Sequence, residues 1–324
     1  MKANFNHSSK SIRVLISDEV HSILIDGLKE AGHTVLYHPG ASREEISGVL
    51  PEVEAWVLRT GVQADADLLS KARSLKWIGR AGVGLDNIDL NAAKQMGITC
   101  ENAGEANADA VGEHTLGLLL MLMNYLGKAF LEVKQGVWLR EENRGTELKG
   151  KTIGIIGFGN TGSAVAAKLS GFGVKVLAYD KYKQGFGSSN IIECGLNQLQ
   201  KEADIISFHV PLTQETHHYF NTQFLNACQK QVFILNLSRG KIVKTADLVE
   251  GLKSGKVKGA ALDVLENERL ETLTKEEKVY FDYLKSSPNV VLTPHIGGWT
   301  QESYGKISTI LLNKFLSFSE NINK

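Results

Sequence analysis

Three side chains that can move protons or bind carboxylates each follow an apolar segment in the C-terminal half of the sequence. Arg239 lies in Asn-Leu-Ser-Arg-Gly, Glu268 ends Leu-Asp-Val-Leu-Glu-Asn-Glu, and His295 lies in Thr-Pro-His-Ile-Gly-Gly. Hydride transfer at a hydroxyl-bearing carbon needs a proton acceptor, a cation for the carboxylate or carbonyl, and a group that orients the acceptor. The three residues supply one of each.

Each of these residues also has an ordinary structural interpretation. An arginine after a strand is usually solvated, a glutamate in an acidic loop usually has no special role, and a loop histidine commonly only forms a hydrogen bond. Glu266 competes with Glu268 as the carboxylate beside the histidine. Taken singly, Arg239 and Glu268 are more often structural, whereas the three residues together favour the chemical interpretation.

A glycine-rich loop, Gly157-Phe158-Gly159-Asn160-Thr161-Gly162, follows an apolar segment and precedes an alanine-rich one. In a dinucleotide-binding loop, the first glycine permits the tight turn, the second lets the pyrophosphate approach the backbone, and the third allows close helix–strand packing. The N-terminus of the following helix supplies free N–H groups to the phosphates. We therefore predict a dinucleotide site; the alternative is another nucleotide-binding loop or a purely structural one.

An acidic residue, Asp180, ends the next predicted strand, about twenty residues after the loop begins, as a dinucleotide fold requires. Its carboxylate can accept both ribose hydroxyls of NAD and would repel the 2′-phosphate of NADP. Lys181 and Lys183 weaken this argument, since either could reach a phosphate. We predict NAD as the cofactor.

Two series of alternating strands and helices must position these residues. In the first series, Ser42 and Glu45 form a capping box at the start of a helix. Its predicted strands are 12–16, 34–37, 56–59, 77–80 and 98–100, with helices at 20–30, from 42 and at 64–72. A long helix at 107–130 follows. The second series has strands at 152–156, 174–179, 204–208, 232–235, 258–262 and 290–292, a helix after the glycine loop to 171, and a final helix at 301–319.

This alternation predicts an α/β protein with parallel sheets that carry helices on both faces. The final helix comes after the second sheet is complete, so we expect it to pack on the first domain. We predict two Rossmann-like or flavodoxin-like domains. The NAD-binding domain, 105–295, is inserted into a discontinuous substrate-binding domain, 1–104 completed by 296–324. Arg239, Glu268 and His295 then leave the carboxyl ends of parallel strands, where open α/β sheets bind ligands.

The composition excludes several other classes of protein. Lys plus Arg and Asp plus Glu number 36 each, so no overall field favours nucleic acid or an anionic membrane. Cys100, Cys194 and Cys228 are too widely spaced for a disulfide framework or a zinc pattern, so we expect no metal and a reducing cytoplasm. The first ten residues lack a signal-peptide core, and the apolar run 116–123 is too short to cross a bilayer.

Several motifs in the same order resemble the D-isomer-specific 2-hydroxyacid dehydrogenase family, and the resemblance covers nearly the whole chain. The shared segments are 80–89, 111–114, the glycine loop, 209–213, Asn-x-Ser-Arg-Gly, Leu-Asp-Val and Pro-His-Ile-Gly-Gly. The resemblance implies that His295 is the general acid/base and Glu268 its carboxylate partner. An ionised Glu268 would favour the imidazolium and fix its ring. Arg239 would bind the substrate's carboxylate and 2-oxygen.

The resemblance also implies the remaining binding residues. Asp263 would contact the nicotinamide carboxamide, and His209 and Pro211 lie on the cofactor side. Backbone N–H groups near Val83 and Gly84 would hold the substrate's carboxylate in the first domain. The active site would lie in a cleft that closes over the substrate. A helix that is apolar at 116–126 would form a homodimer, and ordinary core burial is the alternative.

The leading substrate expectation is D-3-phosphoglycerate, oxidised to 3-phosphohydroxypyruvate in serine biosynthesis, by a short member without a C-terminal regulatory domain. Arg59 resembles the arginine that phosphoglycerate dehydrogenases use for the distal phosphate, although it could simply cap a strand end. A glyoxylate/hydroxypyruvate reductase or a broad D-2-hydroxyacid dehydrogenase is the alternative. An NAD(H)-sensing corepressor that binds partner peptides is the alternative from another class.

Departures from the family pattern concentrate after the catalytic glutamate. Arg269 replaces a common proline, and the stretch 270–287 is longer and more charged than usual, with a helical pattern at 274–284. Gly104 replaces another common proline. These changes remove no chemical group, so they bear on substrate choice more than on mechanism.

Overall fold

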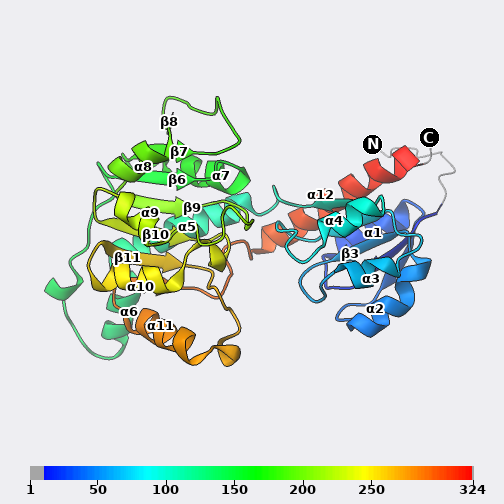
Figure 1. The fold of residues 1–324 in the computed structure, drawn as a ribbon, viewed down its shortest axis with the longest axis horizontal. Coiled ribbons are helices and arrows are strands. Elements are labelled where there is room, and N and C mark those ends of the chain that lie inside the picture. The colour runs from blue at the N-terminus through cyan, green and yellow to red at the C-terminus, as the bar shows by residue number, and fades with distance from the viewer. Residues whose placement is uncertain (1–10, 323–324) are drawn as a thin grey trace. The chain divides into compact units, whose positions relative to one another are not determined.

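The structure is a computed structural model that describes residues 11–322 of the chain. The chain forms two compact units. Unit 1 combines Met1–Asn107 with Trp299–Lys324, and unit 2 is Ala108–Gly298. Both are α/β, with a five-stranded and a seven-stranded parallel sheet (Figure 1). The predicted fold class is confirmed.

Unit 1 contains a parallel sheet in the order β2-β1-β3-β4-β5. This is the flavodoxin-like order, one of the two that the sequence predicted. Because all five strands run the same way, their carboxyl ends form one edge, and Arg59, Val83 and Gly84 follow strands at that edge. The strands are β1 (Arg13–Ile16), β2 (Thr34–Tyr37), β3 (Ala55–Leu58), β4 (Trp77–Arg80) and β5 (Thr99–Asn102).

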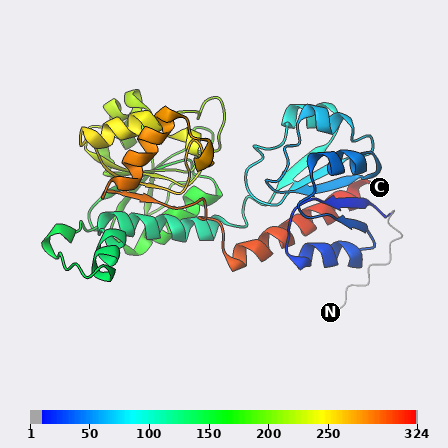
Figure 2. The same cartoon turned by 90° about the horizontal axis from the view of Figure 1, so that it is seen from below.

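Helices cover both faces of this sheet, because its central strands are apolar on both sides. In β3, Ala55 and Val57 face one core, and Trp56 and Leu58 face the other. Figure 2 shows the red helix α12 along one face, beside α1. The helices are α1 (Ser22–Glu30), α2 (Arg43–Val49), α3 (Ala66–Ser70), α4 (Leu90–Gln95) and α12 (Gln301–Ile322). The last of these packs on the first domain, as expected.

Two capping boxes fix helix starts in the structure. The Ser42 side chain accepts from the Glu45 amide at 3.2 Å, and Glu45 accepts from the Ser42 amide at 2.7 Å, as predicted. Thr274 and Glu277 repeat the motif at α11 (Lys275–Ser286), within the long charged stretch. A capping box satisfies two otherwise unpaired amides, so both helices begin at defined residues.

Unit 2 contains a parallel sheet in the order β12-β11-β10-β9-β6-β7-β8. Edge strand β8 was not predicted, because it is only three residues long and mostly exposed. The predicted strands of the second series are otherwise present. The strands are β6 (Thr152–Ile156), β7 (Lys175–Tyr179), β8 (Ile191–Glu193), β9 (Ile205–Phe208), β10 (Val232–Asn236), β11 (Val257–Leu262) and β12 (Val290–Leu292).

Two cores lie on opposite faces of the unit 2 sheet. One contains residues of α5 (Ala108–Met123) and α7 (Asn160–Lys168). The other contains residues of α8 (Leu196–Glu202), α9 (Thr222–Ala227), α10 (Thr245–Lys253) and α11. In Figure 2, α5 runs below the sheet, and the yellow and orange helices α10 and α11 lie above it. Short 3-10 helices occur at Leu50–Glu52, Glu141–Asn143, Leu169–Gly171, Gly240–Ile242 and Leu270–Thr272.

The long helix predicted at 107–130 is wrong in one respect, because it is broken. It divides into α5 and α6 (Leu126–Lys134), bent by 65°. At the junction Tyr125 has a left-handed φ of 52°, which ends a right-handed helix. In the described residues no single helix is long and apolar enough to span a bilayer; only the bent pair α5 and α6 together reaches that length and composition.

Candidate active site

The carboxyl ends of three neighbouring strands in unit 2 lie in one row. Asn236 at the end of β10 pairs with Leu262 of β11, and Leu262 pairs with Leu292 of β12. The segments that carry Arg239, Glu268 and His295 leave from this row. The register of the sheet therefore brings three segments that are far apart in the sequence to the same edge.

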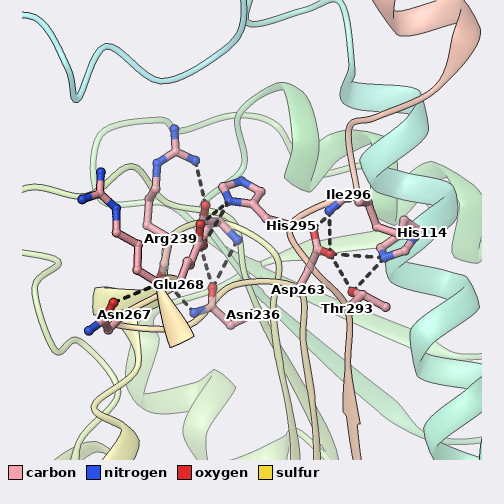
Figure 3. Close-up of polar contacts among 12 residues, drawn as sticks. His114, Asn236, Arg239, Asp263, Asn267, Glu268, Thr293, His295 and Ile296 are labelled. Carbon is pink, nitrogen blue, oxygen red and sulfur yellow. Dashed lines mark hydrogen bonds and ion pairs between the residues drawn. The ribbon is translucent and has the colours of Figure 1, made fainter. Parts of the chain in front are cut away.

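His295 and Glu268 are in direct contact (Figure 3). The histidine Nδ1 lies 3.0 Å from the glutamate carboxylate, and both side chains are nearly half exposed. A proton on Nδ1 donated to the carboxylate leaves Nε2 to accept or release another proton. The pair can thus act as a general base and a general acid on a solute.

The backbone of His295 has an unusual conformation. Its φ is 56°, in the left-handed region that few residues other than glycine adopt. The His295 amide donates to the Asp263 carbonyl at 2.8 Å, and the amides of Ile296 and Gly297 donate to the Asp263 carboxylate at 2.9 and 2.8 Å. Such a conformation costs about 1–3 kcal/mol and persists when its surroundings fix it. Asp263 provides that restraint through three consecutive amides.

Asp263 is a buried carboxylate at the centre of a polar network (Figure 3). It accepts from Thr293 Oγ1 at 2.6 Å, and His114 Nε2 lies 3.2 Å from the same hydroxyl. Burial raises the pKa of Asp263, but hydrogen bonds from His114, Thr293 and two amides outweigh it and hold the pKa below its usual value. Asp263 is therefore ionised. Both of its oxygens accept from the chain itself, and its contact with a nicotinamide carboxamide stays a prediction.

The loop that carries Arg239 is fixed by the buried Asn236. The Asn236 side chain donates to the Arg239 carbonyl at 2.9 Å and accepts from Ser238, while the Arg239 guanidinium donates to the Ser238 carbonyl at 2.7 Å. At Gly240, a Cβ atom would lie 1.8 Å from the Leu265 carbonyl oxygen. The loops after β10 and β11 therefore touch, which only glycine permits there.

Glu266, the competing carboxylate, has other partners. It lies 2.5 Å from His218 Nε2 and accepts from the Thr245 amide at 2.7 Å, at the N-terminus of α10. An anion is stabilised at a helix N-terminus, so this position suits a structural carboxylate. The structure places Glu268, and not Glu266, against His295. Sequence reasoning missed the His218–Glu266 pair, since nothing local joins residues so far apart.

The glycine loop has the geometry that a dinucleotide phosphate needs. Gly157 has φ 92°, and a Cβ there would lie 2.4 Å from the His209 carbonyl oxygen. A Cβ at Gly162 would lie 2.0 Å from the Gly157 carbonyl oxygen. Gly159 is the N-cap of α7, whose first residues are Asn160 and Thr161. A Cβ atom added at Gly159 would have no other atom within 4 Å. Two glycines are thus required by packing and the third adjoins open space, so this loop fits a pyrophosphate.

Asp180 follows β7 and is joined to the glycine loop. It accepts from the Phe158 amide at 2.8 Å and from two amides of its own turn. Burial raises the pKa of Asp180, but these hydrogen bonds outweigh it, so the pKa lies below its usual value. Lys181 pairs with Glu215 at 2.7 Å, and Lys183 donates to the Phe158 carbonyl at 3.1 Å. Both lysines that could favour NADP are therefore engaged within the chain.

His209 and Pro211 follow β9 beside the glycine loop. The His209 ring is buried 2.8 Å from the Ser207 hydroxyl. Burial lowers the pKa of His209 to about 4, so the ring is neutral near pH 7. Pro211 is exposed, and its carbonyl accepts from Thr216 at 2.6 Å. His209 therefore presents its backbone, and not its ring, to the loop.

The remaining predicted binding residues lie in unit 1. Arg59 follows β3, and its guanidinium lies 4.6 Å from the centre of the Trp299 ring. Val83 and Gly84 follow β4, where the Val83 carbonyl accepts from the Asn102 side chain. Within residues 11–322, no group of three His, Cys, Asp or Glu side chains is placed to hold a metal ion.

Comparison with known proteins supports the fold and NAD as the cofactor. Residues 116–297 match the NAD binding domain model of the D-isomer specific 2-hydroxyacid dehydrogenase family. The chain is 36% identical over 303 residues to D-3-phosphoglycerate dehydrogenase from Methanocaldococcus jannaschii, which covers 93% of this chain and 56% of that protein. It is 39% identical over 272 residues to hydroxypyruvate reductase from Thermotoga maritima, which covers 84% of this chain and 87% of that protein.

Among solved structures, D-lactate dehydrogenase from Aquifex aeolicus, complexed with NAD and lactic acid, is similar with a TM-score of 0.82. Its sequence identity is 29%, over 95% of this chain and 96% of that one. The chain spans little more than half the length of the phosphoglycerate dehydrogenase that it matches. It matches most of the hydroxypyruvate reductase, and the family model covers more than half of the chain. This chain belongs to the D-isomer specific 2-hydroxyacid dehydrogenase family.

Proposed function

We propose that this protein is an NAD-dependent dehydrogenase that interconverts a D-2-hydroxy acid and its 2-keto acid. The observation that carries the proposal is the 3.0 Å contact between His295 and Glu268 at the sheet edge that also carries Arg239. These residues lie in the unit that matches the family's NAD-binding domain. We therefore assign NAD binding to unit 2 and substrate binding, through Arg59, Val83 and Gly84, to unit 1.

The proposed mechanism assigns one role to each of the three side chains. NAD, when bound, would supply the hydride acceptor for oxidation of the hydroxy acid, and NADH would supply the hydride donor for reduction of the keto acid. His295 Nε2 takes the hydroxyl proton in the oxidation and gives it back in the reduction. Glu268 stabilises the imidazolium and holds its ring orientation. Arg239 neutralises the carboxylate and polarises the 2-oxygen.

The residues that would hold NAD are those of the glycine loop and its neighbours. The amides at the start of α7 would bind the pyrophosphate, and the open space at Gly159 would let it approach. Asp180 would accept a ribose hydroxyl with the lone-pair site that its three amide donors leave available. Asp263 would orient the carboxamide, with His209 and Pro211 lining the cofactor side.

For the substrate, we propose D-3-phosphoglycerate, oxidised to 3-phosphohydroxypyruvate in serine biosynthesis. The relative from M. jannaschii supports this choice, as does the position of Arg59 at the carboxyl edge of the unit 1 sheet. The hydroxypyruvate reductase of T. maritima, at 39% identity, favours reduction of hydroxypyruvate or glyoxylate instead. A broad D-2-hydroxyacid dehydrogenase would accept all of these.

A homodimer is a further part of the proposal. Helix α5 was expected to bind the partner subunit. Its residues Leu118, Leu119 and Leu122 instead pack in the core of unit 2, so most of its apolar surface is already buried within the chain. Exposed apolar side chains do occur on α6 and in the segment after it, among them Phe130 on α6 and Trp138. A cluster of this kind indicates a protein interface. Sedimentation that gives a 35.4 kDa monomer at all concentrations would exclude the dimer.

The deciding experiment follows the absorbance of NADH as the reaction consumes or produces it. The protein is mixed with NADH and 3-phosphohydroxypyruvate, hydroxypyruvate, glyoxylate or pyruvate, and with NAD and the matching D-hydroxy acids. We expect turnover, with the phosphorylated substrate preferred. Tight NADH binding without turnover of any substrate would instead favour the NAD(H)-sensing corepressor.

A further inference from the structure

A cavity lies in unit 2 between α10, α11 and the loop that follows β11. Its volume is about 210 Å³, which exceeds the roughly 150 Å³ of an apolar cavity that holds benzene. Six of its thirteen lining residues lie in the stretch 270–287, whose length and charge depart from the family pattern. The cavity is therefore a property of this stretch, and it lies outside the residues that the proposed mechanism uses.

Part of the cavity wall is apolar and aromatic. The rings of Tyr280 and Phe281 line it and keep part of their surface exposed, whereas Leu284 is buried. Helix α11, which carries all three, is anchored at both ends. Its first turn is fixed by the capping box of Thr274 and Glu277, and Leu284 packs in the core of unit 2. An apolar wall that stays in place offers a ligand surface to cover.

The polar part of the wall carries more negative than positive charge. Its acidic and basic residues are three glutamates and one lysine: Glu266, Glu276, Glu277 and Lys244. The Lys244 amine pairs with Asp247 at 3.0 Å. The Glu266 carboxylate lies 2.5 Å from His218 Nε2. Lys244 and Glu266 therefore already have partners of opposite charge or hydrogen-bonding capacity within the chain.

Glu276 and Glu277 are the two charges of the wall that no cation balances. Among the residues that the structure describes, no cationic side chain lies within ion-pair distance of either. Glu276 accepts from the Tyr280 hydroxyl at 2.9 Å, and Glu277 accepts from the Thr274 amide at 2.7 Å. The hydrogen bond from this amide holds the pKa of Glu277 below its usual value. The cavity therefore combines an aromatic wall with unbalanced negative charge.

We propose that this cavity is a ligand site for a small organic ammonium with a compact apolar or aromatic body. The apolar wall covers the body, and the carboxylates of Glu276 and Glu277 attract the ammonium group. The faces of the Tyr280 and Phe281 rings attract a cation as well. A ligand of this charge is not a 2-hydroxy acid, so the cavity is not a second substrate site.

A ligand in the cavity also touches the loop that carries Glu268. Residues 265–267 line the cavity, and the next residue, Glu268, lies 3.0 Å from His295 Nδ1. The Asn267 side chain accepts from the Arg269 amide at 3.0 Å, so the turn around Glu268 is built on a residue of the wall. Occupancy therefore restricts this loop and acts on the rate, an effect that rests on the function proposed above.

The first experiment is calorimetry on the full chain without cofactor. The probes are phenethylamine, the neutral phenethyl alcohol and the anionic phenylacetate. For a ligand of about nine non-hydrogen atoms, we expect phenethylamine to bind with a Kd of about 1 mM or tighter. Phenethyl alcohol should bind at least about threefold more weakly, and phenylacetate more weakly still. No binding of phenethylamine, or equal binding of all three probes, would overturn the proposal.

Two variants place the ligand in the cavity. Ala246 of α10 lines it, and Ala246→Leu fills part of its volume at little cost to the helix, so binding should be lost. Glu276→Gln should weaken phenethylamine about two- to fivefold and leave phenethyl alcohol unchanged.

The matched control is Glu271→Gln, which removes an exposed glutamate of the same stretch that does not line the cavity. It should leave all Kd values unchanged. Unfolding in urea checks that each variant folds. Full binding in Ala246→Leu, or an equal loss in the two glutamine variants, would show that the ligand binds elsewhere and would overturn the site.

The effect on the loop is measured with the substrate that is turned over fastest. We expect phenethylamine to change kcat by about twofold or more, with the midpoint of the calorimetric titration, and Ala246→Leu not to respond. Binding without a change in kcat would keep the ligand site and refute its action on Glu268. Binding without turnover of any substrate would keep the ligand site and refute the dehydrogenase, together with that action. Turnover without binding would keep the dehydrogenase and refute the ligand site.

Discussion

The carboxyl edges of the two sheets hold their functional side chains in different ways. In unit 2, the buried and ionised Asp263 binds the amides of His295, Ile296 and Gly297, and His114 and Thr293 complete its shell. In unit 1, the guanidinium of Arg59 lies against an exposed ring and donates to one carbonyl. The side chain at one edge is fixed by a network of hydrogen bonds, and the one at the other edge by a cation–π contact and one hydrogen bond.

This difference matches the demands of the two tasks. Proton transfer requires the donor and acceptor to be placed within a few tenths of an ångström, because misplacement by about 1 Å can cost about 100-fold in rate. Binding of a remote anion tolerates more movement, since a guanidinium attracts an oxyanion over a wider range of positions. We therefore expect mutations at the unit 2 edge to lower kcat and those at the unit 1 edge to change KM.

The largest effect should come from His295→Ala. Removal of the acid/base group should lower kcat by about 100- to 10,000-fold. Stability to urea should not fall, since the side chain is exposed and its loss breaks only the contact with Glu268. Full activity in this variant would contradict the proposed role of His295. Retention of the unfolding midpoint distinguishes the chemical loss from misfolding.

Asp263→Asn should have the next largest effect. One carboxylate oxygen becomes an NH₂ group that faces the donors on the loop of His295, so an amide or hydroxyl loses its acceptor. We expect stability to fall by about 1–3 kcal/mol in urea unfolding, and kcat to fall by about 10- to 100-fold as His295 loses its position. A normal kcat with lowered stability would show that the network serves the fold alone.

The control for this variant is Asp204→Asn. Asp204 precedes β9 and accepts from the Thr152 amide at 2.8 Å, but it lies at the amino ends of the strands. The Asp204→Asn variant should lose some stability and keep kcat.

The pKa of Asp263 is depressed, so its contribution to stability is present above about pH 4, its usual value when unfolded, and is lost as the pH falls further. Asp263→Asn should flatten that part of the profile.

Asp180→Ser tests cofactor choice at the same edge of unit 2. Removal of the carboxylate removes the repulsion toward a 2′-phosphate and an acceptor for the ribose hydroxyls. We expect the KM for NADH to rise and that for NADPH to fall, with a combined change in preference of about tenfold or more. Lys181→Ala, whose amine pairs with Glu215, is the control and should leave the preference unchanged. An unaltered preference in Asp180→Ser would contradict the assignment.

The smallest effect should be a pH dependence from His209. Burial lowers its pKa to about 4, so between that pH and 6.5 the unfolded chain binds a proton that the folded chain does not. Stability should therefore decrease as the pH falls through this window. His209→Asn should weaken that dependence in urea unfolding between pH 4 and 7. An equally steep profile would show that other groups cause it.

The strands, and the sheet edge at which the site residues lie, could be predicted from the sequence. The apolar segments before Arg239, Glu268 and His295 can each be recognised as strands without knowledge of the rest of the fold. The break at Tyr125 and the short strand β8 could not be predicted from the sequence. Each depends on backbone geometry that the residue types around it do not indicate. Contacts such as Trp299 with Arg59 join residues hundreds of positions apart. Only the fold of unit 1 makes them neighbours.

Helix α12 has a consequence for synthesis of the chain. Phe315 of α12 lies 5.3 Å from Trp77 of β4, and Leu311 belongs to the same core as Val14 of β1. The ribosome makes these strands before it makes unit 2, and it makes α12 after unit 2. During translation, unit 2 can therefore complete its core before α12 is available to cover one face of the unit 1 sheet. That face is where a nascent chain would bind a chaperone or aggregate.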